Sequence, residues 1–292
     1  MNILSISGLH KTYPNGVRAI DNISFEIGNG MFGLLGPNGA GKSSLMKTIA
    51  GLQKADGGEI LFNGEDVLND PSSIKKHLGF LPQDFGVYPK VSAYNLLNHL
   101  AILKGITKRN ERKAQINELL NKVNLYEQRN REVHTFSGGM KQRFGVAQAL
   151  LGTPKIIIVD EPTAGLDPEE RNRLNLLLSE ISKNRIVILS THLVEDVKNL
   201  CYQMAIIQNG TLLCVGAPSE LMTKIDNKIW QKAMTHVQFQ EFKTGHSFIN
   251  YEFKQGEICV NIFSEHHPEG FTKASATLEH VYFHHLKTNS TQ

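Results

Sequence analysis

The octapeptide GPNGAGKS, residues 36–43, decides the fold of this chain. It follows the short apolar run MFGLL at residues 31–35 and leads directly into SLMKTIAGL at residues 44–52. An apolar run, a glycine-rich loop and a helical pattern in this order predict a strand, a phosphate-binding loop and a helix, which is the setting that gives GxxxxGK[ST] its meaning. The sequence therefore predicts an α/β fold with a nucleotide site at the end of this strand.

The residue types of this loop suit an anion. Glycines at positions 36, 39 and 41 are expected to adopt backbone angles barred to other residues, so that consecutive N–H groups point at one anion. The helix that opens near Lys42 adds the positive end of its dipole. We expect Lys42 to reach the outer phosphates and the Ser43 hydroxyl to bind Mg²⁺. The predicted nucleotide-binding segment is Gly36, Pro37, Asn38, Gly39, Ala40, Gly41, Lys42, Ser43 and Ser44.

A second apolar segment, KIIIVDEP at residues 155–162, ends in two acids. Its run of β-branched residues predicts a central parallel strand that is covered on both faces. Asp160 then lies at the carboxyl end of the strand, where open α/β sheets bind their ligands, and we expect it to hold Mg²⁺. Glu161 follows at once and is the candidate base for an attacking water. A solvated acid pair at a strand end is the alternative, which the glycine loop upstream disfavours.

Between these two segments lies FSGGMKQR, residues 136–143, followed by a helical stretch. Ser137 is a candidate helix N-cap, and Gly138 and Gly139 allow another backbone to approach closely. With this motif the chain resembles the ATP-binding cassette (ABC) ATPases, which carry an LSGGQ-type motif between their two nucleotide-binding segments. Phe136 stands in place of the leucine and Met140 in place of the glutamine. The resemblance therefore implies that Ser137, Gly138 and Gly139 contact nucleotide.

Other landmarks of the family follow in order. Tyr13, in HKTYPNG, resembles the aromatic residue that stacks on adenine, with an ordinary loop tyrosine as the alternative. Gln83, in GFLPQDFG, resembles the glutamine that contacts Mg²⁺ and water, and residues 164–167 resemble the D-loop. His192, in ILSTHL, resembles the histidine near the γ-phosphate, although a lone histidine at a strand end is usually structural. The resemblance covers residues 2 to about 220.

This resemblance implies a function and a set of site residues. The chain is expected to bind ATP with Mg²⁺ and to hydrolyse it, driving export through a separate membrane permease subunit. The alternative is a soluble ABC ATPase of translation or DNA repair. Two cassettes, identical or different, are expected to face head to tail and to lie at the cytoplasmic side of the membrane. The implied catalytic residues are Glu161, His192 and Gln83, and the implied Mg²⁺ ligands are Ser43, Gln83 and Asp160.

Composition narrows the classes of function. The chain has 292 residues and a net charge of +3. Its pI of about 8.6 is not basic enough to indicate a nucleic-acid partner. Cys201, Cys214 and Cys259 lack metal-type spacing, and their odd number favours a reduced setting. We expect neither a signal peptide nor a membrane span, because no apolar run approaches about 20 residues. Transport would therefore need a membrane subunit.

Periodicity predicts how the chain is organised. Strand patterns fill residues 2–35 and return at 186–190 and 204–215, while residues 92–126 have helical spacing. The expected fold is a P-loop core with an antiparallel β-subdomain, a helical subdomain and a small C-terminal α+β appendage. The predicted units are a cassette at residues 1–224, its helical subdomain at about 84–136, and the appendage at 225–292.

The tail beyond residue 224 is less regular. Residues 246–253 and 257–263 are predicted to pair as strands, and residues 274–286 to form a helix with an apolar face. The stretch ATLEHVYFHHL within that helix resembles the end of ABC exporter ATPases of the drug, polysaccharide and lipid type. His280 and His284 are spaced to share a metal ion. No acidic or thiol partner stands at ligand spacing, so a solvated polar face is the favoured interpretation.

Overall fold

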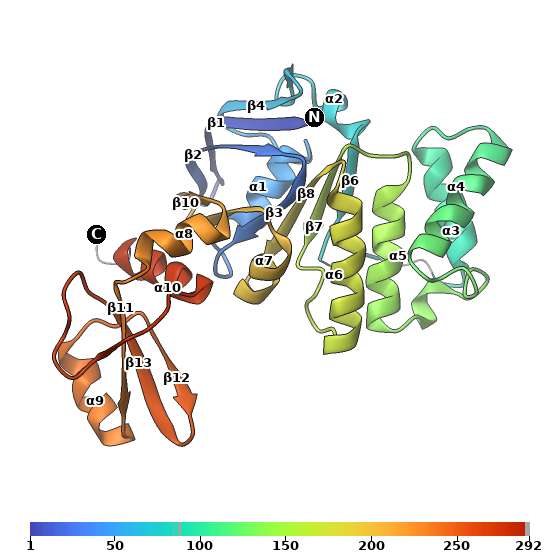
Figure 1. Cartoon of the computed structure of the whole chain (residues 1–292). Coiled ribbons are helices and arrows are strands. Elements are labelled where there is room, and N and C mark those ends of the chain that lie inside the picture. Colours follow the sequence, from blue (N-terminus) through green and yellow to red (C-terminus); the bar gives the residue numbers. More distant parts are fainter. Residues whose placement is uncertain (84, 87–88, 290–292) are drawn as a thin grey trace.

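The computed structural model describes residues 1–83, 85–86 and 89–289, and within them the chain forms three β-sheets flanked by helices (Figure 1). A six-stranded, mostly parallel sheet lies in the middle of the molecule. An antiparallel sheet lies above it in Figure 1, and the sheet of the C-terminal region lies below it. The predicted α/β fold with an antiparallel β-subdomain is confirmed.

The central sheet brings the two predicted phosphate-site segments to one edge. Its strand order is β10-β9-β3-β8-β7-β6, and among these described strands only β10 runs against its neighbour. The glycine loop follows β3 and the acid pair ends β7, with β8 between them, so both segments meet at the carboxyl edge of parallel strands. The strands are β3 (Gly30–Leu35), β6 (Leu78–Leu81), β7 (Ile156–Asp160), β8 (Ile186–Thr191), β9 (Gln203–Gln208) and β10 (Thr211–Gly216).

Strand β7 shows why both faces of this sheet are covered. Ile156 and Ile158 pack into the apolar cluster under the antiparallel sheet, whereas Ile157 and Val159 pack into the cluster formed with the helices. Each of the four side chains is at most 2% exposed. Strands covered on both sides need such unbroken apolar runs, as the sequence predicted.

The antiparallel sheet packs over the first helix, α1 (Lys42–Ile49). Leu9, Ile20 and Phe62 of this sheet share one apolar cluster with Leu45 of α1 and with the central sheet. The helix after the phosphate loop is therefore held against two sheets, which fixes the end of the loop where α1 begins. The sheet order is β2-β1-β4-β5, with β1 (Ile3–Thr12), β2 (Arg18–Gly28), β4 (Gly57–Phe62) and β5 (Glu65–Asp66).

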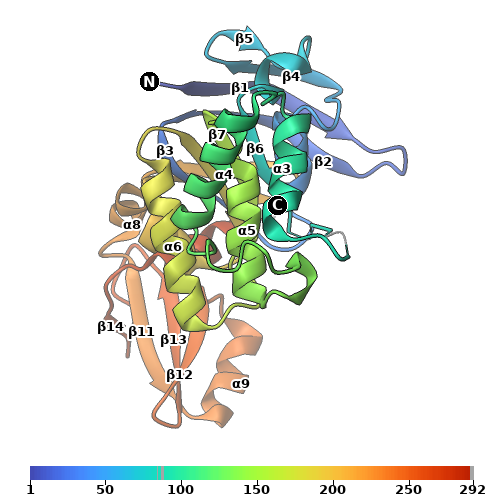
Figure 2. The same cartoon turned by 90° about the vertical axis from the view of Figure 1, so that its right-hand side faces the viewer.

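Helices cover the opposite face of the central sheet. In Figure 2, α3 and α4 lie in front of α5, and their presence confirms the helical pattern predicted for residues 92–126. Asp84, the first residue of the predicted helical subdomain, lies outside the described residues. None of the helices in the described ranges combines the length and hydropathy needed to cross a bilayer. Between α1 and the C-terminal region, the described helices are α2 (Pro71–Lys75), α3 (Ala93–Leu103), α4 (Arg109–Lys122), the 3₁₀ turn Val133–Thr135, α5 (Gly138–Leu150), α6 (Pro168–Ser182), α7 (Val194–Leu200) and α8 (Pro218–Ile225), of which α2 packs on the side of the antiparallel sheet.

The C-terminal region forms a four-stranded sheet in the order β12-β13-β11-β14, with α9 packed on one face. The predicted hairpin is confirmed, with Lys254 opposite Glu257 at its turn. Strand β11 and helix α9 were not predicted, although Thr235 and Gln238 form a capping box that marks the start of α9. The elements are β11 (Ile229–Met234), α9 (His236–Gly245), β12 (Asn250–Lys254), β13 (Glu257–Phe263), β14 (Thr272–Lys273) and α10 (Leu278–Asn289).

The last helix, α10, returns from this sheet to the main core. Leu278, Val281 and Tyr282 are at most 6% exposed and belong to the same apolar cluster as Val197 of α7 and Met204 of β9. The helix also contacts α8 and β10. The apolar face predicted for this helix is confirmed, and its partner surface is the core that precedes residue 224.

The histidines of α10 are not a solvated polar face. His280 is 4% exposed, and its Nδ1 accepts a hydrogen bond from the Thr277 N–H at 3.2 Å. The ring of His284 stacks on Phe263, with ring centroids 4.3 Å apart. Burial lowers the pKa of both His280 and His284. The favoured interpretation is therefore wrong for His280, because the helix docks instead of facing water. No cluster of three metal-ligating side chains forms in the part of the chain that the structure describes.

Candidate functional site

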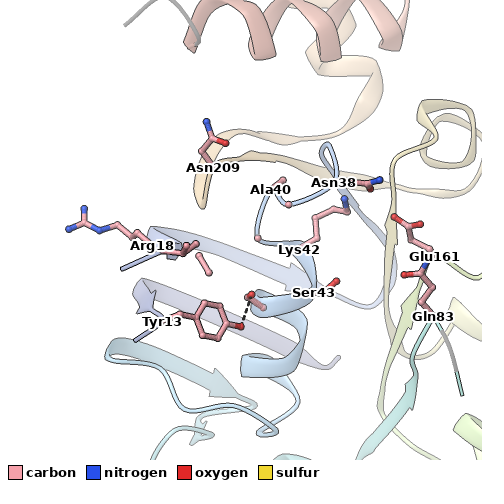
Figure 3. A pocket seen from close by; sticks show the side chains of 14 residues that line it. Tyr13, Arg18, Asn38, Ala40, Lys42, Ser43, Gln83, Glu161 and Asn209 are labelled. Carbon is pink, nitrogen blue, oxygen red and sulfur yellow. Dashed lines mark hydrogen bonds between the residues drawn. The ribbon is translucent and has the colours of Figure 1, made fainter. Parts of the chain in front are cut away.

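A pocket of about 590 Å³ opens at the carboxyl edge of the parallel strands (Figure 3). Figure 3 shows Lys42 between Tyr13 and Arg18 on one side and Glu161 and Gln83 on the other. Residues that are far apart in the sequence, from the antiparallel sheet of β1 and β2 and from the central sheet, therefore line one cavity. Its lining residues are Tyr13, Val17, Arg18, Ala19, Asn38, Gly39, Ala40, Gly41, Lys42, Ser43, Ser44, Gln83, Glu161 and Asn209.

The glycines of the phosphate loop are needed for two different reasons. Gly39 and Gly41 have φ angles of 79° and 105°, in the left-handed region that favours glycine. Gly36 lies outside that region, but a Cβ there would collide with the carbonyl oxygen of Ile207 in β9. The prediction that all three glycines supply unusual backbone angles is therefore wrong for Gly36, which instead permits the close approach of β9.

Lys42 lies over its own loop. Its Nζ donates hydrogen bonds to the carbonyl oxygens of Gly36 at 2.7 Å and Pro37 at 3.1 Å, and the residue is 6% exposed. Burial lowers the pKa of Lys42, while the carboxylates of Glu161 and Asp160 act in the opposite direction. A cation is thus held between the loop and the two acids, where it can pair with a phosphate group.

Asp160 joins three elements at the end of β7. Its Oδ2 accepts a hydrogen bond from the Ser43 hydroxyl at 3.2 Å, and its Oδ1 accepts one from the hydroxyl of Ser190 in β8. A carboxylate and a hydroxyl beside a phosphate loop are hard oxygen ligands that suit Mg²⁺. The predicted metal ligands Ser43 and Asp160 are therefore adjacent, and Gln83 lines the same pocket.

Glu161 and His192 meet at the ends of neighbouring strands. Glu161 Oε1 lies 3.1 Å from His192 Nδ1, with side-chain exposures of 12% and 43%. The φ of Glu161 is 47°, a left-handed angle that is uncommon outside glycine, and its N–H donates to the Ser190 carbonyl at 3.0 Å. Backbone strain of this kind clusters at functional sites. The structure thus brings the two predicted catalytic side chains into contact.

Tyr13 bounds the pocket on the side opposite Glu161. Its hydroxyl donates a hydrogen bond to Gln53 Oε1 at 2.8 Å and lies 3.0 Å from Ser44 Oγ. A tight turn supports it, since the Tyr13 N–H donates to the Val17 carbonyl at 2.8 Å. Tyr13 is therefore held in place at the wall of the pocket, and its stacking on a base stays a prediction.

The Ser137 segment does not belong to this pocket. Ser137, Gly138 and Gly139 are absent from its described lining, and Ser137 and Gly138 are exposed. Ser137 caps α5 by accepting the Met140 N–H at 3.3 Å, which confirms the predicted N-cap. Gly139 is buried, and a Cβ at this position would collide with the Glu170 carboxylate of α6. The first N–H groups of a helix have no partner within the helix, so an anion is favoured at the start of α5, which is exposed at Ser137 and Gly138.

Several pocket residues were not predicted from the sequence. Arg18 and Asn209 line the pocket, and Gln53 holds Tyr13, but none belongs to a motif. Asn209 and Gly210 form the turn between β9 and β10, and the Asn-Gly pair is a recognisable turn signal. Nothing in the sequence indicates that β9 pairs with β3, which is what brings this turn to the phosphate loop, where the Gly210 N–H donates to the Ala40 carbonyl at 2.9 Å.

Comparison with known sequences finds matches over the part of the chain that carries the phosphate loop, the Ser137 segment and the acid pair. The family described as "ABC transporter" matches residues 20–164. The linearmycin resistance ATP-binding protein LnrL of Bacillus subtilis is 32% identical over 96% of this chain and 92% of its own length. The molybdate/tungstate import ATP-binding protein WtpC of Methanocaldococcus jannaschii is 34% identical over 78% of this chain and 75% of its own. ABC transporter A family member 8 of Dictyostelium discoideum is 38% identical over 75% of this chain, which spans 27% of that longer protein.

Solved structures show the same fold. The structure of cbiO1 from Clostridium perfringens, described as part of the ABC transporter complex cbiONQ, superposes with a TM-score of 0.68 and 26% identity. It covers 76% of this chain and 90% of its own. About a quarter of this chain therefore has no counterpart in that structure.

Proposed function

The chain belongs to the ABC transporter family as an ATP-binding and ATP-hydrolysing subunit, and from that premise we propose that it drives export through a separate membrane permease. The observation that carries the proposal is the meeting of the phosphate loop, Asp160, Glu161 and His192 at one sheet edge. The relatives it matches are transporter proteins, which favours transport over a role in translation or DNA repair.

In the proposed reaction a water attacks the γ-phosphorus and the bond to the oxygen between the β- and γ-phosphates breaks, giving ADP and phosphate. Glu161 accepts the proton that the water loses, and His192 orients Glu161 through their contact. Lys42 balances negative charge on the outer phosphates, and Tyr13 packs on the base. When bound, Mg²⁺ neutralises charge on the phosphate oxygens, and the residues that would hold it are Ser43, Asp160 and Gln83.

We propose that each site is shared between two cassettes. Ser137, Gly138 and Gly139 are absent from the described lining of the pocket in one chain, whereas the start of α5 is exposed at Ser137 and Gly138 and is capped by Ser137. Ser137, Gly138 and Gly139 of a second cassette, identical or different, would supply N–H groups to the γ-phosphate held by Lys42. ATP then bridges the two chains, and hydrolysis removes the bridging phosphate.

We propose export and not import because of the share of this chain that each relative covers. The match to the resistance protein LnrL runs through 96% of this chain and so includes most of the C-terminal region. The match to the import protein WtpC covers only 78%. We assign residues 1–224 to the cassette, about 84–136 to its helical subdomain, and 225–292 to an accessory region. Such a subunit would lie at the cytoplasmic face of the membrane through its permease, without a nucleic-acid partner.

The test of this function is Glu161→Gln. The amide keeps the shape of the side chain but cannot accept the proton, and loss of a general base costs about 10²- to 10⁴-fold in kcat. ATP affinity should persist, and an ATP-bound dimer should accumulate on size-exclusion chromatography. Glu169→Gln is the matched control, because the Glu169 side chain is 76% exposed and pairs only with Arg173 on the surface of α6 among the described contacts. Parental turnover in Glu161→Gln would show that Glu161 is not the base.

A further inference from the structure

A buried hydrogen bond ties the loop after Glu161 to the helix after His192. Thr163 Oγ1 donates to Asp196 Oδ2 at 2.7 Å, and both residues are 1% exposed. Thr163 follows Glu161 by two positions, and Asp196 lies in the first turn of α7, directly beyond His192. The bond therefore connects the two segments that carry the two proposed catalytic side chains.

Asp196 also contacts a third element. Its Oδ1 lies 3.8 Å from Nε of Arg171 in α6, which is an ion-pair contact too long for a hydrogen bond. The Asp196 N–H donates to the Leu193 carbonyl at 3.2 Å, so the carboxylate sits at a helix start, where negative charge is favoured. A buried carboxylate is costly to leave without partners. Asp196 therefore resists movement of Thr163, Arg171 or its own helix away from one another.

The Glu161 loop depends on this anchor. Two backbone hydrogen bonds hold Glu161: its N–H donates to the Ser190 carbonyl, and its carbonyl accepts the Ala164 N–H at 3.3 Å. Its left-handed φ is an uncommon angle that these bonds and the turn after Glu161 must maintain. The chain then turns back, with the Leu166 N–H donating to the Thr163 carbonyl at 3.3 Å. Thr163 is thus the point at which the turn is attached to α7. Misplacing a reacting group by about 1 Å costs on the order of a hundredfold in rate.

We propose that Asp196 is a positioning residue that acts through Thr163. It keeps the Glu161 carboxylate and the His192 ring at the separation that hydrolysis needs. Asp196 is buried and is absent from the described lining of the pocket, so it acts on the rate and not on nucleotide affinity. The inference rests on the proposed roles of Glu161 and His192.

The test compares Thr163→Val with Thr163→Ser in the full chain. Valine keeps the shape without the hydroxyl, whereas serine keeps the hydroxyl. We expect Thr163→Val to lower kcat about tenfold or more, the equivalent of one hydrogen bond to a charged group. KM for ATP should stay within about twofold, because the contacts of Lys42 and Tyr13 are untouched. A merely structural role would lower the melting temperature without this separation of kcat from KM.

Thr163→Ser supplies the decisive comparison, since it should recover most of the lost kcat. Parental kcat in Thr163→Val, or equal losses in both variants, would overturn the proposal. If Thr163→Val does not fold, Asp196→Asn and Asp196→Ala decide instead, because only the asparagine retains an oxygen to accept the Thr163 hydroxyl. An active Asp196→Asn beside a slow Asp196→Ala supports the proposal, and equal rates overturn it.

The same experiments separate this inference from the proposed function. Parental turnover in Glu161→Gln would remove the role of Glu161 and, with it, the role proposed for Asp196. An inactive Glu161→Gln together with a fully active, folded Thr163→Val would leave the ATPase mechanism intact and overturn the positioning role alone.

Discussion

The phosphate loop and the Ser137 segment carry the two most specific motifs of this chain, and their surroundings differ. Around the loop, Lys42 is 6% exposed and lies near Asp160 and Glu161, at the end of β7 in the same sheet. Ser137, at the start of α5, is exposed and makes its cap bond only within its own helix among the described contacts. The phosphate loop therefore has partner side chains from another part of the same chain. Ser137 has no such partners among the described contacts.

This difference teaches how the site is divided. A helix start with glycines and free N–H groups is suited to bind an anion, but the anion held by this chain's own loop lies in another pocket. The helix start would therefore serve a second cassette. We call the phosphate loop with Asp160 and Glu161 the loop half of the site, and the start of α5 at Ser137 the other half. Substitutions can disrupt each half separately, and the expected effect depends on which half carries the substitution.

Among Lys42→Ala, Leu278→Ala and Tyr13→Ala, the largest effect on turnover is expected from Lys42→Ala, which removes the cation of the phosphate loop. Removing one preorganised donor to developing charge costs about 10²- to 10³-fold in kcat, and ATP affinity should fall as well. Lys47→Ala is the matched control, because Lys47 lies on the same helix and faces solvent. Turnover assays and ATP titration measure both. Unchanged affinity and turnover in Lys42→Ala would contradict the phosphate-loop assignment.

A substitution in α10 should lower the free energy of unfolding, because this helix packs against α7, α8, β9 and β10 of the cassette. Leu278 is 1% exposed beside residues of α7 and β9, and Leu→Ala at such a site costs about 2–5 kcal/mol of unfolding free energy. Leu278→Ala should therefore lower the melting temperature of the whole cassette. Leu176→Ala, at a side chain that is 74% exposed on α6, should not. If both variants melt like the parent, α10 is not part of the cassette core.

A smaller effect is expected from Tyr13, at the edge of the loop half. Tyr13→Ala should weaken ATP binding by about 1–3 kcal/mol, the worth of stacking an aromatic ring on a base. Tyr13→Phe keeps the ring but loses the hydroxyl contacts with Gln53 and Ser44, so it should weaken ATP binding less than Tyr13→Ala does. Titration of ATP distinguishes the two. Equal losses in both variants would show that the hydroxyl, and not the ring face, matters.

The sequence predicted the loop half better than the rest, for a physical reason. Phosphate binding demands fixed residue types at fixed spacing, so Lys42, Ser43 and Asp160 are recognisable from the sequence alone. The reason assigned to Gly36 was wrong, because its need arises from the close approach of Ile207, which depends on strand order. Asn209 was missed for the same reason, since its turn reaches the site only through the pairing of β9 with β3.

The C-terminal region was harder to predict. Its hairpin was predicted from two strand-like stretches on either side of Gln255 and Gly256, but β11 carries a mixed pattern of buried and exposed residues that gives no clear period. The burial of His280 was missed, because a histidine-rich helix looks polar until its partner surface is known. Thr163 and Asp196 lie outside the motifs that were named as site residues, and their hydrogen bond joins segments that only the fold brings together.

The central claim, that two chains share each site, is tested most directly by mixing Ser137→Arg chains with Lys42→Ala chains. Each variant alone should be inactive, one because the arginine blocks docking on the partner's phosphate and the other because the cation is lost. A mixed dimer has one site with both defects and one intact site. We predict that ATPase activity returns, up to about a quarter of the parental rate for random pairing. No recovery in mixtures whose mixed dimers are detected by native mass spectrometry would contradict a shared, independently working site.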